Sequence, residues 1–177
     1  MKKYDLRWAI LIIAMFSTFI CACRTNSKPE PIAPFSEASW NCNVEEMIAL
    51  EGNSYSSYDS VYGGTTYSYS KDYDGYKGTI KYMFDQNKQL MCIAWAYGCD
   101  NEKELLSLYE NINQKVNETH GKSSYNADSH ASNYGNVWYL KSGDIILSTM
   151  VTTENKALQY AYLNPLVSNS DTQTETD

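Results

Sequence analysis

Three short groups of residues carry side chains that could do chemistry together. Ser68 and Lys71 are three positions apart, and the segments 124–126 (SYN) and 141–143 (KSG) follow later in the chain. A lysine one helical turn after a serine can take the proton of the hydroxyl, so that the oxygen can attack a carbonyl carbon. This chemistry requires Ser68 to begin a buried helix, with the two later segments folded around it.

In their order along the chain, the three groups resemble the S-x-x-K, S-x-N and K-[ST]-G motifs of penicillin-binding proteins and β-lactamases. The resemblance implies a serine hydrolase with Ser68 as the nucleophile. However, Ser68 lies in an alternating Thr/Tyr/Ser sequence, which predicts a strand rather than a helix. The 177-residue chain is also short for the helical domain and sheet that assemble such motifs. We therefore expect no catalytic residues, and a serine hydrolase remains the less favoured alternative.

The titratable residues do not predict a metal site. Neither His120 nor His130 has a ligand partner at the usual spacing. Asp72 and Asp74 resemble a fragment of a calcium loop, but the third oxygen ligand and the terminal Glu are missing. Asp74 followed by Gly75 is typical of a turn between two strands. We expect no metal and no other cofactor.

Three cysteines follow position 23, namely Cys42, Cys92 and Cys99. Exported chains meet oxidising surroundings, so one pair can form a disulfide. Cys92 and Cys99 lie at opposite ends of one predicted strand, ~20 Å apart if it is straight, which separates them unless the strand bends. Cys42 and Cys99, both at element ends, are the predicted pair. Three reduced thiols are the alternative.

Tyrosine is abundant, with 16 in the chain, and many lie in the Ser-, Tyr- and Gly-rich segment 53–78. Tyrosine suits half-buried strand positions, where the ring packs and the hydroxyl meets water. It also suits binding surfaces, because it offers a large contact area at low entropic cost. We predict a contact surface that contains Tyr67, Tyr69, Tyr73 and Tyr76, extended by Tyr55, Tyr58 and Tyr62. Packing of these rings in the core is the alternative that the sequence leaves open.

The first 22 residues have the layout of an export signal. Three basic residues precede an apolar run over residues 8–20, which is too short to span a bilayer. Residues 20–23 (ICAC) resemble the lipobox of bacterial lipoproteins, with Cys23 as the modified residue. Cys21 fits less well, because Ile20 is bulky where the pattern has a small residue. An ordinary secretory signal or an uncleaved anchor is the alternative.

The lipobox resemblance implies a location. Residues 1–22 would be removed and Cys23 would carry fatty-acyl chains such as palmitate, which hold the chain at the cell membrane or outer membrane, facing away from the cytoplasm. We expect residues 23–39, which contain three prolines, to be a tether, residues 40–166 to be the folded domain, and residues 167–177 to be a disordered tail. The net charge of −7 argues against a nucleic-acid partner.

The hydrophobic pattern predicts two helices and six strands. The helices run from the caps Asn43 and Asn101 to Gly52 and Gly121, and Glu46 and Glu104, each three residues after its cap, are expected to complete capping boxes. The strands cover the ranges 65–70, 80–84, 90–98, 136–141, 145–151 and 157–163, and the apolar strand 90–98 is expected to be central. The predicted class is α+β, with two helices on one face of an antiparallel sheet and an internal αβββ duplication as an option.

This order of elements resembles two small envelope modules: the lipoprotein component of outer-membrane assembly machinery and the β-lactamase-inhibitor-like repeat. No residue motif supports either resemblance, so no functional residue is carried over. We predict a membrane-anchored lipoprotein with a non-catalytic domain that binds a protein or a cell-wall component. Inhibition of an extracellular enzyme is the alternative that the second resemblance implies.

Overall fold

The computed structural model describes residues 31–128 and 133–167. The predictions for the export signal, for Cys23 and for the tail from residue 168 onward fall outside these residues.

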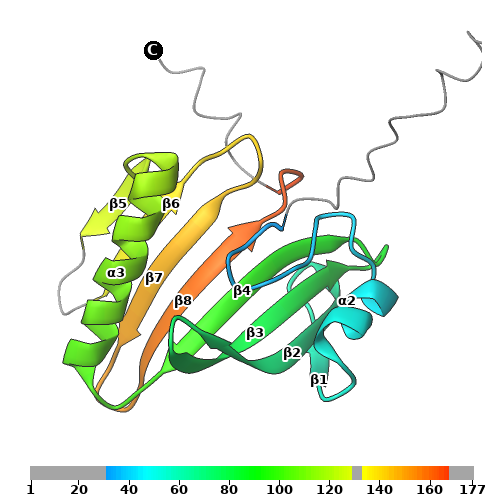
Figure 1. The fold of residues 1–177 in the computed structure, drawn as a ribbon, viewed down its shortest axis with the longest axis horizontal. Coiled ribbons are helices and arrows are strands. Elements are labelled where there is room, and N and C mark those ends of the chain that lie inside the picture. Colours follow the sequence, from blue (N-terminus) through cyan, green and yellow to red (C-terminus); the bar gives the residue numbers. More distant parts are fainter. Residues whose placement is uncertain (1–30, 129–132, 168–177) are drawn as a thin grey trace, which may run out of the picture. The chain divides into compact units, whose positions relative to one another are not determined.

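The described residues form two helices and one large sheet (Figure 1). The elements are α2 (Val44–Glu51), β1 (Ser56–Asp59), β2 (Gly63–Tyr73), β3 (Tyr76–Asp85), β4 (Leu90–Gly98), α3 (Glu102–His120), β5 (Tyr125–Asp128), β6 (Tyr134–Trp138), β7 (Ile145–Val151) and β8 (Lys156–Leu163). All neighbouring strands are antiparallel, and their order is β1-β2-β3-β4-β8-β7-β6-β5. The prediction that the strand at 90–98 is central is confirmed, because β4 and β8 lie in the middle of the sheet.

The predicted α+β class with an αβββ duplication is wrong. Eight strands make one antiparallel sheet and only two helices accompany it in the described residues, so the fold is dominated by the sheet. Helix α2 has two turns and buries only Met47, so the helices do not form a layer comparable to the sheet. The αβββ repeat is not evident, because the two helices differ in length (8 against 19 residues) and four strands rather than three follow each of them.

Helix capping fixes where both helices begin. The Asn43 side chain accepts from the Glu46 N–H, and the Glu46 carboxylate accepts from the Asn43 N–H, which completes the predicted capping box. Asn101 caps α3 in the same way, but Glu104 does not complete a capping box at this helix. The Glu104 carboxylate instead accepts a hydrogen bond from the Tyr97 hydroxyl. The second box prediction is therefore wrong.

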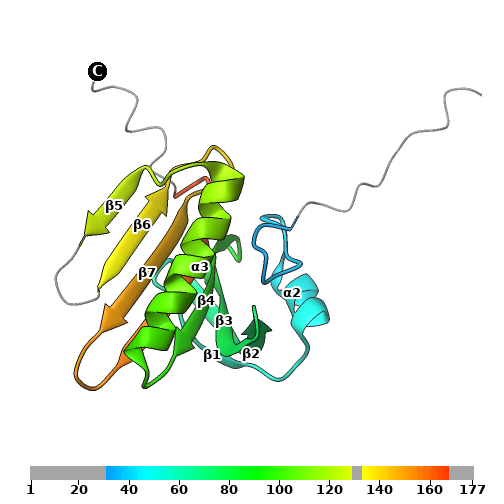
Figure 2. The same ribbon diagram turned by 60° about the vertical axis from the view of Figure 1, so that its left-hand side comes forward.

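The sheet has two unlike faces. Along β4, Ile93 and Trp95 point to the face covered by the helices, whereas Cys92 and Ala94 point to the other face. Helix α3 packs on β7 and β8 through buried apolar residues. Figure 2 shows α3 and α2 on the same side of the strands. Most buried aromatic rings belong to this covered face.

The segment before α2 belongs to the folded domain. Ala33, Phe35 and Ala38 are each at most 3% exposed, and the Ile32 N–H donates to the Ala38 carbonyl to close a compact loop. The prediction of a tether through residue 39 is therefore wrong for residues 33–39. The prolines suggested an extended spacer, but the apolar residues between them pack onto the sheet.

Two short strands at the edges were not predicted. Strand β1 (SSYD) and strand β5 (YNAD) lack the apolar alternation that marks a half-buried strand. The turn at Asp74 and Gly75 is confirmed, since both residues have positive φ between the paired residues Tyr73 and Tyr76.

Candidate functional site

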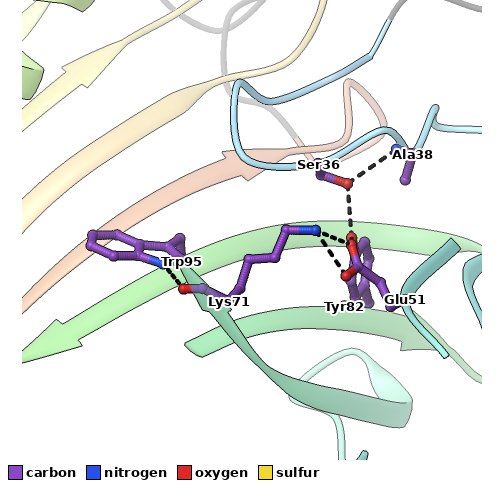
Figure 3. Close-up of polar contacts among 6 residues, drawn as sticks. All are labelled: Ser36, Ala38, Glu51, Lys71, Tyr82 and Trp95. Atoms are coloured by element: carbon purple, nitrogen blue, oxygen red, sulfur yellow. Dashed lines mark hydrogen bonds and ion pairs between the residues drawn. The ribbon is translucent and has the colours of Figure 1, made fainter. Parts of the chain in front are cut away.

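A network of polar side chains is buried between α2, the segment before it, and strands β2 and β3 (Figure 3). Its centre is Glu51, the last residue of α2, whose side chain is 7% exposed. Lys71 of β2 donates to both carboxylate oxygens of Glu51, at Nζ–O distances of 3.0 and 2.9 Å. The hydroxyl of Tyr82, a fully buried residue of β3, donates to Glu51 Oε1 at 2.6 Å.

The network continues into the segment before α2. Ser36 Oγ lies 2.8 Å from the Tyr82 hydroxyl and accepts the Ala38 N–H at 3.0 Å. An ionised carboxylate only accepts, so the Tyr82 proton goes to Glu51 and the Ser36 proton goes to Tyr82. Every donor then points toward Glu51. This fixed direction makes the network a clamp between residues 36–38, α2 and the sheet.

A glycine and a tryptophan set the position of the Lys71 backbone. Trp95 Nε1 donates to the Lys71 carbonyl at 2.9 Å, although β3 lies between their strands. At Gly78 of β3, an added Cβ would lie 2.5 Å from the Trp95 ring. The indole can therefore cross β3 only because position 78 carries no side chain.

This geometry does not favour nucleophilic or acid–base chemistry. The Lys71 ammonium is held by two carboxylate bonds, and an ammonium has no lone pair with which to attack. Burial and the bond to Glu51 raise the pKa of Tyr82 well above its usual value, so Tyr82 keeps its proton at neutral pH. We interpret the network as structural.

A second cluster on the covered face is aromatic. Phe35 makes edge-to-face contacts with Tyr73, Tyr160 and Tyr162, at centroid distances of 5.3 to 5.9 Å. The hydroxyls of Tyr160 and Tyr162 lie 2.6 Å apart, and burial raises the pKa of both side chains. The ring of Phe35 thus seals a pair of buried phenols from water.

The four tyrosines of the predicted contact surface lie mostly against the core. Tyr69 is 4% exposed, so the prediction that it is a contact residue is wrong. Tyr67, Tyr73 and Tyr76 are half-buried and pack against the core, which supports the alternative that the sequence left open. The Tyr69 hydroxyl is buried with no hydrogen-bond partner. Of the three further tyrosines in that prediction, Tyr55 and Tyr58 are exposed and Tyr62 is half-buried.

The structure does not bring the three Ser/Lys motifs together. Ser68 and Lys71 are an odd number of positions apart on β2, so their side chains point to opposite faces of the sheet. Ser124 precedes β5, which is six strand positions away from β2, or roughly 30 Å at the usual strand spacing. The described structure therefore keeps the Ser68 and Ser124 segments apart.

The predicted Cys42–Cys99 disulfide is not present in the structure, and all three described cysteines are free. Cys42 is buried beside α2, and Cys99 is half-exposed just after β4. Burial raises the pKa of the Cys42 thiol to about 11 and that of the Cys92 thiol to about 12. Both buried thiols are therefore poor nucleophiles at neutral pH.

An exposed region surrounds the edge strand β1. All four β1 residues are exposed, Tyr58 among them at 48%, and the neighbouring residues Tyr55 and Val61 are 39% and 86% exposed. Between the first turn of α2 and the adjoining ends of β2 and β3 lies a hollow of about 440 Å³. Its walls include the side chains of Tyr67 and Phe84 and two carboxylates, Glu45 and Asp85.

Two residues of the network, Ser36 and Glu51, are not predicted from the sequence. Ser36 falls in the predicted tether, and Glu51 falls at the end of the first predicted helix. One signal was available for Glu51: it follows Met47 by four positions, and such residues share a helix face, so the buried face of α2 ends in a carboxylate.

Within the described residues, no group of His, Cys, Asp and Glu has the arrangement of a metal site. Neither described helix is long and apolar enough to cross a membrane. In comparisons with known proteins, no family model, no curated protein and no solved structure matches the chain.

Proposed function

We propose that this protein is a lipoprotein anchored outside the cytoplasm through Cys23, and that its sheet domain has a non-catalytic role in binding a protein or a cell-wall component. The observation that carries the proposal is the boundary at residues 20–23, which follows a basic head and an apolar run of signal-peptide length. Two acyl chains anchor a protein stably where one does not, which suits a domain that works at a membrane surface.

The state of the polar side chains supports the non-catalytic part of the proposal. In the buried network, the Lys71 ammonium and the Tyr82 hydroxyl donate hydrogen bonds to the Glu51 carboxylate. The hollow at β2 and β3 is lined by side chains other than those of the network. Polar groups that hydrogen-bond one another within the fold stabilise it, which suits a structural role for the network.

The experiment that tests the anchor is fatty-acid labelling of the full chain in a bacterial host. Wild-type protein is grown with an alkyne fatty acid, beside the variant Cys23→Ala and the matched control Cys21→Ala. We expect label on the wild type and on Cys21→Ala, an N-terminus at residue 23 by mass spectrometry, and no label on Cys23→Ala. An unlabelled wild type, or a mature chain that starts elsewhere, would contradict the proposal.

A separate measurement tests the non-catalytic role. Folded protein is incubated with a fluorophosphonate probe and with a fluorescent β-lactam, and its peptides are analysed by mass spectrometry. We expect no adduct. An adduct on Ser68 that disappears on heat unfolding would support the serine hydrolase instead.

A further inference from the structure

Strand β1 is an edge strand of the sheet. Of its two edges, one pairs with β2 through four residue pairs, and no described strand pairs with the other. Outward N–H and C=O groups of an edge strand are a template for another chain. Natural edges are commonly protected by short length, charged side chains, proline or a bulge. Strand β1 is short and ends in Asp59, but it has no lysine, proline or bulge.

The surroundings of β1 offer side-chain contacts in addition to the backbone. Tyr58 and Val61 are 48% and 86% exposed, and Tyr55 is 39% exposed while its ring packs on Tyr67 at a centroid distance of 5.2 Å. Exposed tyrosines give contact area at low entropic cost, as they do in known binding surfaces. Apolar side-chain surface therefore borders the edge, and an added strand would bury it favourably.

The residues around the hollow next to β1 favour a positively charged ligand group. Asp59 of β1 lies directly opposite Thr65 of β2, so both side chains face the side of the sheet that carries the hollow, which Thr65 lines. The charged residues that line the hollow are Glu45, Asp85 and Lys88, and Asp59 lies beside the hollow, opposite the lining residue Thr65. With aromatic walls and a carboxylate excess, the hollow suits the long stem and charged head of a lysine or arginine.

The charge also decides between two occupants of the edge. A second copy of this chain would bring a net charge of −7 against another −7, and would place a second set of carboxylates beside the first. A basic segment from another protein would meet complementary charge. We propose that β1 and the adjoining hollow bind an extended, basic segment of a partner protein, which pairs with β1 as a ninth strand and places a basic side chain over the hollow.

This inference rests on the proposed binding role and names its partner class, but it does not depend on the lipid anchor. In strand addition, main-chain hydrogen bonds supply affinity and alternate side chains supply specificity. The segment would present one basic residue opposite Asp59 on the covered face. Ser57 also faces that side, opposite Tyr67, and its side chain is small.

The test uses the full-length protein as the host processes it, purified in detergent micelles, and a labelled six-residue peptide of alternating valine and arginine. Fluorescence anisotropy measures its binding. We expect saturable binding that weakens about tenfold when glutamate replaces the arginines. Two further peptides carry N-methyl groups on alternate amides, one on the odd and one on the even positions, so that each lacks the N–H donors of one edge. One of these two peptides is expected to lose binding and the other to keep it. Equal binding of the two methylated peptides, or binding of the glutamate peptide equal to that of the arginine peptide, would overturn the proposal.

Two variants locate the site on the protein. Glu45→Gln is expected to weaken binding of the arginine peptide about two- to fivefold, the usual range for a surface charge pair, and Tyr58→Ser is expected to weaken it further. The matched control Glu110→Gln, an exposed carboxylate on α3, is expected to leave binding unchanged. If both site variants bind like the wild type, the proposed surface is wrong.

One further measurement separates this proposal from its competitor and from the proposed function. Sedimentation of the micellar protein without peptide reports self-association. A dimer that Tyr58→Ser dissociates, together with no peptide binding, would assign the edge to a second copy and overturn the basic partner. The alkyne labelling of Cys23 is read on the same preparation, so loss of peptide binding with intact labelling rejects only this inference.

Discussion

Removal of the Glu51 carboxylate should destabilise the domain strongly, although Glu51 lies in a two-turn helix near the surface. In Glu51→Ala, the Tyr82 hydroxyl loses its acceptor at 2.6 Å while it stays fully buried. An unsatisfied buried donor costs about 1–3 kcal/mol. The Lys71 ammonium also loses its partner, but its side chain is 31% exposed and can return to water.

The magnitude follows from these differences in burial. We discount the Lys71 pair to about 0.5 kcal/mol, because solvent screens an ion pair that is partly exposed. The methylenes of Glu51 that leave the protein interior add roughly 1 kcal/mol. Together with the Tyr82 hydroxyl, the expected loss in the free energy of unfolding is about 3 kcal/mol, a large part of the stability of an ordinary domain.

Urea denaturation of the full-length protein, followed by tryptophan fluorescence, measures this loss. The matched control is Glu154→Gln, an exposed carboxylate in the turn between β7 and β8, for which we expect a change below about 0.5 kcal/mol. The variant Lys71→Met and the double variant complete a cycle that isolates the coupling between Glu51 and Lys71. A loss for Glu51→Ala no larger than that of the control would refute the argument that Glu51 holds the clamp together.

Four further predictions concern burial. Tyr69→Phe removes a buried hydroxyl without a partner and should leave urea stability equal or raise it by up to about 1 kcal/mol, whereas Tyr82→Phe should lower it by about 2 kcal/mol. Phe35→Ala should lower stability by about 3 kcal/mol and the exposed Pro34→Ala by far less; equal effects would return residues 33–39 to the tether. In peptide mapping at pH 8, maleimide should label Cys99 before the two buried thiols, whose pKa values are raised by burial; resistance of Cys99 until a reductant is added would support the disulfide. Burial raises the pKa of Tyr69 to about 12, and the folded state therefore holds this proton more tightly than the unfolded state. This stabilisation is complete below about pH 10. At higher pH each buried tyrosine loses about 1.4 kcal/mol of it per pH unit. Circular dichroism should therefore show unfolding near about pH 11, and a domain that is still folded at about pH 12 would contradict the burial.

The strongly patterned elements of this fold could be predicted from the sequence. The caps Asn43 and Asn101 locate both helices, because an exposed Asn before a helical pattern has one strongly favoured local use. The run 90–98 predicts a central strand, since its residues are apolar on both faces. In each case the local preference and the tertiary packing agree, so the local signal was sufficient.

The remaining features depend on contacts between residues that are distant in the sequence. The edge strand β1 is polar on both faces and is a strand because β2 offers it partners, which no local pattern reveals. Ser36 joins the candidate site only through Tyr82, which is 46 positions later. Likewise, the prolines before Phe35 indicated an extended spacer, but the segment forms a compact loop in which the ring of Phe35 contacts three aromatic residues of the sheet. Burial of that ring outweighs the extended preference of its neighbours.

The packing of the segment 33–39 into the folded domain changes what the proposed anchor implies. A tether from residue 24 to residue 39 would have sixteen residues and a maximum reach of ~55 Å. Because Ala33 is already packed in the domain, nine residues remain between Cys23 and the fold, and their reach is at most ~30 Å. A lipid-anchored domain would then stay within about one domain diameter of its membrane, so a partner that presents a basic strand to β1 must itself extend to that surface. Insertion of a ten-residue Gly/Ser segment after residue 30 should leave the urea stability unchanged and extend this reach; a loss of stability would mean that the fold begins earlier than Ala33.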